Sequence, residues 1–306
     1  MKPLRPGMRF YAPHTFTLPL PPEHRFPRSK YGMLRTQLLK DNVLGASQLV
    51  ESTPARDEAI LRAHAPDFVA QFENGDLEEK AMKRIGFPWS PELVMRTRAT
   101  VGGAVAAAET ALEFGISGQL AGGTHHAHRT FGSGYCIYND QAVAALHLLA
   151  AGMVERVAII DLDVHQGDGS AAILADNPSV FVFSMHGEKN FPFRKVPADL
   201  DVALPDGTGD ADYLRALNDY LPNVFSFRPD IILYQAGVDP LEEDRLGRLA
   251  LTHDGLAQRD RTVLQACKSR GIPVSMAIGG GYADPIEASV TAYINTYRVA
   301  REVYGF

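Results

Sequence analysis

The chain has 306 residues, of which 30 are Lys or Arg and 36 are Asp or Glu, so its formal net charge is −6. This slight acidity excludes a protein that holds nucleic acid by bulk positive charge. Hydrophobic residues make up 45% and charged residues 22% of the chain, a balance typical of soluble globular proteins. Two cysteines, Cys136 and Cys267, are too few for a disulfide scaffold or a four-thiolate metal site. We expect one large α/β domain over residues 1–306.

The N-terminal segment 1–30 carries no recognisable targeting signal. It contains no apolar run of signal-peptide length, and its seven prolines disfavour the amphipathic helix of a transit peptide. No segment of the chain has the ~18 uninterrupted apolar residues of a membrane span. We therefore expect a cytoplasmic protein that binds neither membranes nor nucleic acid directly.

Helical patterns dominate the first half of the chain. Apolar spacing and end signals predict helices at 31–40, 56–72, 77–85, 91–114 and 140–152. The fourth has the clearest start, because the capping hydroxyl of Ser90 precedes Pro91 and Glu92. Gly115 is its expected end.

Strand-like and helical patterns alternate in the rest of the chain. After a short strand that ends near residue 120, apolar runs of buried-strand length lie at 157–162, 180–184, 231–235 and 273–278. Helical patterns separate or follow them, at 170–175, 210–225, 253–270 and 284–304. This alternation predicts a mainly parallel sheet with helices on both faces, which is a three-layer α/β fold in a single domain.

Polar or glycine-rich segments stand where each predicted strand ends. They occupy 122–128, 161–169, 184–186, 236–240 and 279–282. Ligands of open parallel sheets bind beyond the carboxyl ends of the strands. We therefore expect these five segments to meet at one site.

Asp163 and His165 lie two residues apart, which places both side chains on the same side of an extended segment. With Asp239 from another strand end, they offer two carboxylates and one imidazole. Three protein ligands with an open position are typical of a catalytic divalent metal, most often zinc. In the alternative interpretation the two aspartates cap helices and His165 is a hydrogen-bonded turn residue.

His125 and His126 are adjacent, and Asp161 and Asp168 flank the candidate metal ligands. A carboxylate that accepts a hydrogen bond from an imidazole fixes its tautomer and raises its basicity, so two His–Asp pairs are expected. A buried structural pair of histidines is the alternative. Tyr282 follows three glycines and is a candidate donor to a developing oxyanion, unless the segment is only a turn. Structural or surface roles are expected for His14, His64, His128, His147 and His253.

Together these blocks resemble the histone deacetylase family of the arginase/deacetylase fold. The resemblance rests on GGTHHAHRTFGSGYCIYND at 122–140, DLDVHQGDG at 161–169, SMH at 184–186, QAGVD at 235–239 and GGGY at 279–282. The similarity to the family extends to RAHAPDFV at 62–69 and RIGFPWSPELV at 84–94. The blocks follow the family's order along nearly the whole chain and are most similar to its class IV-type and bacterial branch.

The resemblance implies two metal sites and a set of catalytic residues. One zinc ion per chain is held by Asp163, His165 and Asp239. A structural potassium ion is held, partly through backbone carbonyls, by Asp161, Asp163, His165, Ser184 and Met185. His126 takes the proton of the attacking water and returns it to the leaving amine, and His125 orients the water. Their respective carboxylate partners are Asp168 and Asp161, and the substrate carbonyl is polarised by Tyr282.

The implied reaction is removal of acetyl, or longer acyl, groups from the ε-amine of lysine in proteins or peptides. Residues matched to the substrate tunnel are Gly134, Tyr135, Phe191, Leu246 and Gly280. Leu246 stands where acetylpolyamine-cleaving members carry a glutamate, and gap-free counting puts Phe87 where class I-type members carry a rim aspartate. The short loop 187–205 suggests a more open tunnel that admits longer acyl chains.

Three alternatives stay open. A deacylase of small acylated amines such as acetylpolyamines would share the site chemistry. A binuclear manganese ureohydrolase shares the fold but needs further carboxylates where this chain has Gly167, Gly237 and Leu241. A non-catalytic acyl-lysine binder would normally have lost a ligand, histidine or tyrosine, and here these residues are all present.

Overall fold

The computed structural model describes residues 7–306, so Pro3 and Pro6 of the proline-rich segment lie outside the described residues. Within them, parallel strands form one eight-stranded sheet in the order β2-β1-β3-β8-β7-β4-β5-β6. The strands are β1 (Phe10–Ala12), β2 (Leu49–Glu51), β3 (Ile116–Gln119), β4 (Val157–Asp161), β5 (Val180–Gly187), β6 (Leu200–Leu204), β7 (Ile231–Gln235) and β8 (Val274–Ala277).

Helices connect these strands. They are α1 (Ser29–Lys40), α2 (Asp57–Ala63), α3 (Pro66–Asn74), α4 (Glu79–Ile85), α5 (Pro91–Phe114), α6 (Asp140–Ala150), α7 (Asp168–Leu174), α8 (Asp210–Ser226), α9 (His253–Arg270) and α10 (Glu287–Tyr304). Among residues 7–306, none of the helices is both long and apolar enough to cross a membrane.

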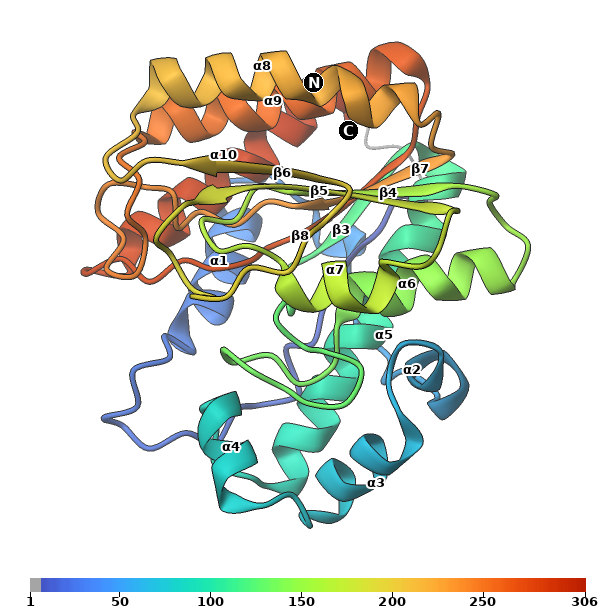
Figure 1. Ribbon diagram of the computed structural model, residues 1–306. Coiled ribbons are helices and arrows are strands. Elements are labelled where there is room, and N and C mark those ends of the chain that lie inside the picture. The colour runs from blue at the N-terminus through green and yellow to red at the C-terminus, as the bar shows by residue number, and fades with distance from the viewer. Residues whose placement is uncertain (1–6) are drawn as a thin grey trace.

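The sheet lies between two helical layers (Figure 1). Helices α1, α8, α9 and α10 pack on one face, and α5 and α6 pack on the other, with α2, α3 and α4 further out. Alternate residues of each central strand serve the two layers: Ala158 and Ile160 face the first, and Val157 and Ile159 face the second. The three-layer parallel architecture is therefore confirmed.

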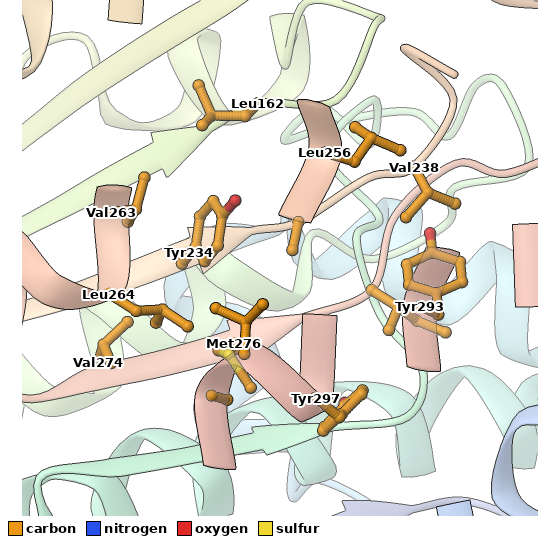
Figure 2. Close-up of a cluster of buried hydrophobic side chains, with 14 of the residues drawn as sticks. Leu162, Tyr234, Val238, Leu256, Val263, Leu264, Val274, Met276, Tyr293 and Tyr297 are labelled. Carbon is orange, nitrogen blue, oxygen red and sulfur yellow. The ribbon is translucent and has the colours of Figure 1, made fainter. Parts of the chain in front are cut away.

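The layer of α9 and α10 anchors the centre of the sheet. Figure 2 shows Leu264 of α9 and Tyr297 of α10 in one buried cluster with Val274 and Met276 of β8. Tyr234 of β7 lies in the same cluster. Burial on this scale, about 1.5–3 kcal/mol for each large apolar side chain, fixes the strands and hence their carboxyl ends.

Local end signals place several helices where the sequence predicts them. Ser90 accepts a hydrogen bond from Leu93 N–H at the start of α5, and Gly115 ends this helix with a left-handed φ of 84°. Asn139 caps α6 in the same way, accepting from Ala142 N–H. The helix predicted at 253–270 has those bounds in the structure.

Other predicted boundaries are wrong, and prolines explain two of them. The helix predicted at 56–72 is two helices, because Ala65 precedes Pro66 and takes an extended conformation. The last helix begins at Glu287 rather than residue 284, since residue 284 precedes Pro285 and a residue before a proline disfavours the helical backbone. The prediction also missed β1, β2 and β6, and ended β5 three residues early. β6 lies inside the segment 187–205, which was predicted to be a loop.

Candidate active site

Asp163, His165 and Asp239 converge beyond the carboxyl ends of β4 and β7. His165 Nδ1 lies 3.0 Å from Asp163 Oδ1 and 3.0 Å from Asp239 Oδ2. The three side chains are buried, and their potential ligand atoms all lie within 4.8 Å of one another. Burial and the neighbouring charge of Asp163 raise the pKa of Asp239 to about 7. Two crowded carboxylates and an imidazole fit a divalent cation, which would offset the repulsion between the carboxylates.

Backbone N–H groups and glycines hold these carboxylates in place. Val164 N–H donates to Asp239 Oδ1 at 2.9 Å, and Gly280 N–H donates to Asp163 Oδ2 at 2.6 Å. A Cβ atom on Gly280 would lie 1.8 Å from Asp239 Oδ2, and one on Gly237 would lie 2.2 Å from Asp163 Oδ2. The turns after β7 and β8 therefore close over the carboxylates only because these positions lack side chains.

The tandem histidines pair with different aspartates. His125 Nδ1 lies 2.7 Å from Asp161 Oδ2, and His126 Nδ1 lies 2.6 Å from Asp168 Oδ1. Because an ionised carboxylate can only accept, each ring carries its proton on Nδ1. Each Nε2 is thereby left available for another partner. The structure thus brings together the two expected His–Asp pairs.

The two histidines differ in charge although they are neighbours. Burial alone would lower the pKa of His125, but the charges of Asp161 and Asp163 outweigh it and raise the pKa to about 9. Burial and the nearby His125 lower the pKa of His126 to about 3. These shifts favour the charged form of His125 and the neutral form of His126. A neutral imidazole is the form that accepts a proton.

Both histidines and Tyr282 line one cavity of about 430 Å³, together with Asp163 and His165. The predicted tunnel residues also line it, namely Gly134, Tyr135, Phe191, Leu246 and Gly280. Phe191 meets His126 edge to face, with ring centroids 4.8 Å apart. Burial and the charge of Asp239 raise the pKa of Tyr282 well above its usual value, so its hydroxyl stays protonated and can donate.

Comparison with known proteins identifies the family. The sequence matches the histone deacetylase domain over residues 24–297. This chain belongs to the histone deacetylase family. Histone deacetylase 2 of Arabidopsis thaliana is 29% identical over 85% of this chain and 70% of its own length. Acetoin utilization protein AcuC of Staphylococcus aureus is 32% identical over 85% of this chain and 73% of its own.

The fold agrees with that assignment. The crystal structure of a histone deacetylase homologue from Aquifex aeolicus superimposes with a TM-score of 0.82 at 25% identity, covering 97% of this chain and 84% of the other. The arginase/deacetylase fold is thus confirmed. Membership in the family implies a hydrolase of acetylated amides, and Asp163, His165 and Asp239 form a potential site for the metal on which the family generally depends.

The residue counted at the place of the rim aspartate packs inside the protein. In this histone deacetylase family member, Phe87 is buried and packs against Phe26 and Tyr135, with ring centroids 4.9 Å and 5.2 Å away. The position counted as the rim aspartate is therefore an internal support of the tunnel wall. Leu246, by contrast, lies at the cavity with 46% of its surface exposed.

His128 contacts the second His–Asp pair, although the sequence predicted only a structural or surface role for it. His128 Nε2 lies 2.9 Å from Asp168 Oδ2, so Asp168 accepts from both His126 and His128. His64 supports His128 in turn, because its Nδ1 donates to the His128 carbonyl at 3.0 Å. The spacing of two residues between His126 and His128 was the only signal in the sequence.

Lys30 of α1 is a second residue that sequence reasoning missed. Its buried Nζ donates to the carbonyls of Gly279 and Gly281 at 3.2 and 3.3 Å. It also lies 5.1 Å from the ring centroid of Tyr282. Burial lowers the pKa of Lys30 to about 8, although the negative charge of Asp239 acts to raise it. Lys30 thus holds the glycine turn that leads into Tyr282, through its hydrogen bonds to Gly279 and Gly281.

The residues matched to a potassium site lie together at the ends of β4 and β5. Asp161 is paired with Ser184 in the strand register, and Met185 follows. All three are buried. Ser184 Oγ lies 3.0 Å from His186 Nδ1.

Proposed function

We propose that this protein is a zinc-dependent lysine deacetylase, acting on acetyl-lysine in proteins or peptides, with residues 1–306 as one catalytic domain. The observation that carries the proposal is the convergence of a metal triad, two His–Asp pairs and a protonated tyrosine on one cavity. These are the parts that hydrolysis of an amide requires: an electrophile for the carbonyl, a base for the water and an acid for the leaving amine.

The metal would be held by Asp163, His165 and Asp239, with one zinc ion per chain. When bound, such an ion supplies Lewis-acid polarisation of the amide carbonyl and lowers the pKa of a water molecule from about 15.7 toward 7. Asp161, Ser184 and Met185, with carbonyls from the Asp163–His165 turn, are proposed to hold a structural potassium ion.

The protein's own groups then move protons and stabilise charge. His126 accepts the proton of the attacking water at Nε2 and later gives it to the leaving lysine amine, because Asp168 fixes its Nδ1 proton. His125, charged and held by Asp161, orients the water. The Tyr282 hydroxyl donates to the carbonyl oxygen as negative charge develops there.

The substrate arm would lie between Gly134 and Tyr135 on one side and Phe191 on the other. The ideal Cβ position of Gly134 is 2.9 Å from His126 Cδ2 and 3.2 Å from the Phe191 ring, so a larger residue there would obstruct the arm. Gly280 and Leu246 line the cavity as well. The unbranched methylene chain of an acetylated lysine suits such a passage.

The alternatives find less support. An acetylpolyamine needs a carboxylate for its second ammonium group, and the candidate position holds Leu246. A second metal ion would need carboxylates at Gly167, Gly237 and Leu241. Within residues 7–306, Asp163, His165 and Asp239 form the one cluster of potential metal ligands, which favours a single ion. The intact triad and tyrosine weigh against a non-catalytic binder.

A substrate panel tests the proposal. Product release would be measured for each substrate: acetate from an acetyl-lysine peptide and from N-acetylputrescine, and urea from arginine-type ureohydrolase substrates. Octanoyl- and myristoyl-lysine peptides, followed by release of the fatty acid, are further arms. We expect the acetyl-lysine peptide to be hydrolysed with the highest kcat/KM of the three classes. Hydrolysis confined to N-acetylputrescine would instead establish the small-amine alternative and refute a lysine deacetylase.

A further inference from the structure

We propose that the preferred substrates carry carboxylates beside the acylated lysine, bound by a basic rim at the cavity mouth. The basic rim consists of Arg84, Lys189 and Arg248. This inference rests on the proposed function, because it concerns the parts of the substrate that stay outside the cavity while the acyl-lysine arm is inside.

Among residues 7–306, every exposed charged side chain that lines the cavity is basic. Arg84 belongs to α4, Lys189 follows β5, and Arg248 precedes α9, so three separate segments bring positive charge to one opening. The acidic residue among the lining residues is Asp163, which is buried as a candidate metal ligand. The mouth therefore carries positive charge on a chain whose net charge is −6.

This charge is only partly neutralised by the protein. Lys189 Nζ and Arg248 Nη1 share a single carboxylate oxygen of Asp206, at 3.7 and 3.2 Å. Arg84 has no carboxylate within 4.0 Å in the described part of the chain. Its guanidinium instead lies 4.7 Å from the ring centroid of Phe131. Three cations against one carboxylate leave a positive rim with capacity for further anionic partners.

The rim is fixed to the tunnel rather than carried on free loops. The carbonyl of Arg84 accepts a hydrogen bond from Gly134 N–H at 3.2 Å, next to the tunnel wall. On the other side, the buried Asn190 accepts from Arg248 N–H at 3.2 Å and donates to the Leu246 carbonyl at 2.7 Å. Because Asn190 follows Lys189 in the chain, its side-chain amide joins the segment of Lys189 to the segment of Arg248. The backbone at Arg84, Lys189 and Arg248 is therefore fixed relative to the cavity.

A positive rim discriminates among lysine sites by charge. Asp or Glu residues that flank the acyl-lysine would pair with the rim, whereas flanking Lys or Arg, or the second ammonium of an acetylpolyamine, would be repelled. Exposed ion pairs are individually weak, so we expect about a 10-fold difference in kcat/KM between acidic and basic flanks at low salt. Salt should reduce the difference, since the Debye length falls to about 3 Å at 1 M.

The test uses three acetyl-lysine peptides that differ only in the residues flanking the lysine, which are Asp, Asn or Lys. The expected order of kcat/KM is Asp, then Asn, then Lys, and the spread should shrink as salt is added. Free Nε-acetyl-lysine and its carboxamide form a further pair, which separates a small carboxylated amine from an acidic peptide as the source of the carboxylate. A higher kcat/KM for the Asp peptide than for the Asn peptide, or for free Nε-acetyl-lysine than for its carboxamide, supports carboxylate binding by the basic rim.

Charge-reversal variants locate the effect. Arg84→Glu, and separately Arg248→Glu, each lower the charge of the rim by two and so offset the excess of three cations over the Asp206 carboxylate. Each variant should therefore bring the kcat/KM values of the Asp and Lys peptides close together. Arg215→Glu on α8 makes the same change in net charge at an exposed position outside the cavity, and should keep the wild-type order. Equal kcat/KM of the wild-type protein for the three peptides, or a spread of kcat/KM unchanged by both rim variants, would overturn the proposal while turnover of the Asn peptide still upholds the deacetylase. Failure to hydrolyse any of the peptides would overturn both.

Discussion

At the scale of single residues, Tyr282 is held by its backbone as well as by its ring. Its N–H donates to Asp244 Oδ2 at 2.5 Å, and its carbonyl accepts from Arg245 Nε at 3.1 Å. Lys30 Nζ lies over this ring, 5.1 Å from its centroid. Because none of these contacts uses the phenol oxygen, the hydroxyl is free to serve the substrate, and its removal should spare the fold.

Tyr282→Phe should therefore lower kcat on an acetyl-lysine peptide by about 100- to 1,000-fold, the cost of one oxyanion donor, with the melting temperature little changed. Tyr304→Phe is the matched control, because its buried hydroxyl has no hydrogen-bond partner within residues 7–306. Its kcat should equal that of the wild type. Near wild-type turnover by Tyr282→Phe would show that this hydroxyl does not stabilise the oxyanion.

Sequence reasoning identified the residues whose signal is local. Asp163 and His165 stand two apart after a strand, and Tyr282 follows a glycine run, so pattern and chemistry coincide. Lys30 and His128 gave no such signal because their partners are remote in the chain. Lys30 contacts a carbonyl 249 residues away, and His128 contacts a carboxylate 40 residues away. Only the assembled fold brings these groups to the site.

At the scale of elements, α9 fixes the strand ends that carry the candidate metal ligands. The fully buried Arg259 donates from Nη1 to the carbonyls of Leu162 and Gly237, at 3.2 and 2.6 Å. Leu162 precedes Asp163, and Gly237 lies two residues before Asp239. Arg259 also pairs with the buried Asp260 at 2.8 Å. One side chain of a covering helix thus ties β4 to β7 beside the site.

Arg259→Met should lower the free energy of unfolding by about 3–5 kcal/mol, because it leaves the Asp260 charge buried without its partner. Arg261→Met is the control on the same helix, since Arg261 makes an exposed ion pair with Glu302 at 2.6 Å. That substitution should cost at most about 1 kcal/mol. Urea denaturation of the two variants measures both values, and equal losses would contradict the assigned role of Arg259.

Elements with strong local signals were predictable, and short ones were not. The cap at Ser90 and the stop at Gly115 defined α5 because both act within one helical turn. Strands β1 and β2 have only three residues each, too few for a pattern to emerge. β6 exists because Leu200–Leu204 pairs with the end of β5, a contact that no local pattern indicates.

At the scale of the whole molecule, several histidines are buried in the neutral form. Burial lowers the pKa of His64 and of His186 to about 4 each. His64 Nε2 accepts from Asn139 N–H at 2.9 Å, so a proton there would break the bond. Between pH 4 and 6.5 each of these two histidines binds a proton in the unfolded chain but not in the folded one, so the stability that they contribute falls as the pH is lowered through this range.

His64→Gln should weaken this dependence on acid. The Gln side chain can accept from Asn139 N–H but does not titrate. The slope of unfolding free energy against pH should therefore decrease by about 1.4 kcal/mol per pH unit, the contribution of one proton. Denaturant titrations at several pH values between about 4.5 and 6 measure the slope. An unchanged slope would mean that His64 does not take up its proton on unfolding.

The fold class was predictable, and the order of the strands was not. Alternating apolar strands and helices indicated a parallel sheet, but β8 lies between β3 and β7, and β1 lies between β2 and β3. The strand order depends on how each connection crosses the sheet. The packing of whole helical layers against the sheet decides this. The site was still predictable, because in any such order the carboxyl ends of parallel strands share one edge.

We propose that one metal ion at Asp163, His165 and Asp239 supports hydrolysis of acetyl-lysine. The most direct test removes metal with a chelator and adds zinc back in steps while peptide turnover is measured. We predict that the metal-free protein is inactive and that turnover rises linearly with added zinc to a plateau at one equivalent per chain. Full turnover by the metal-free protein, or a plateau reached only at two equivalents, would contradict this account.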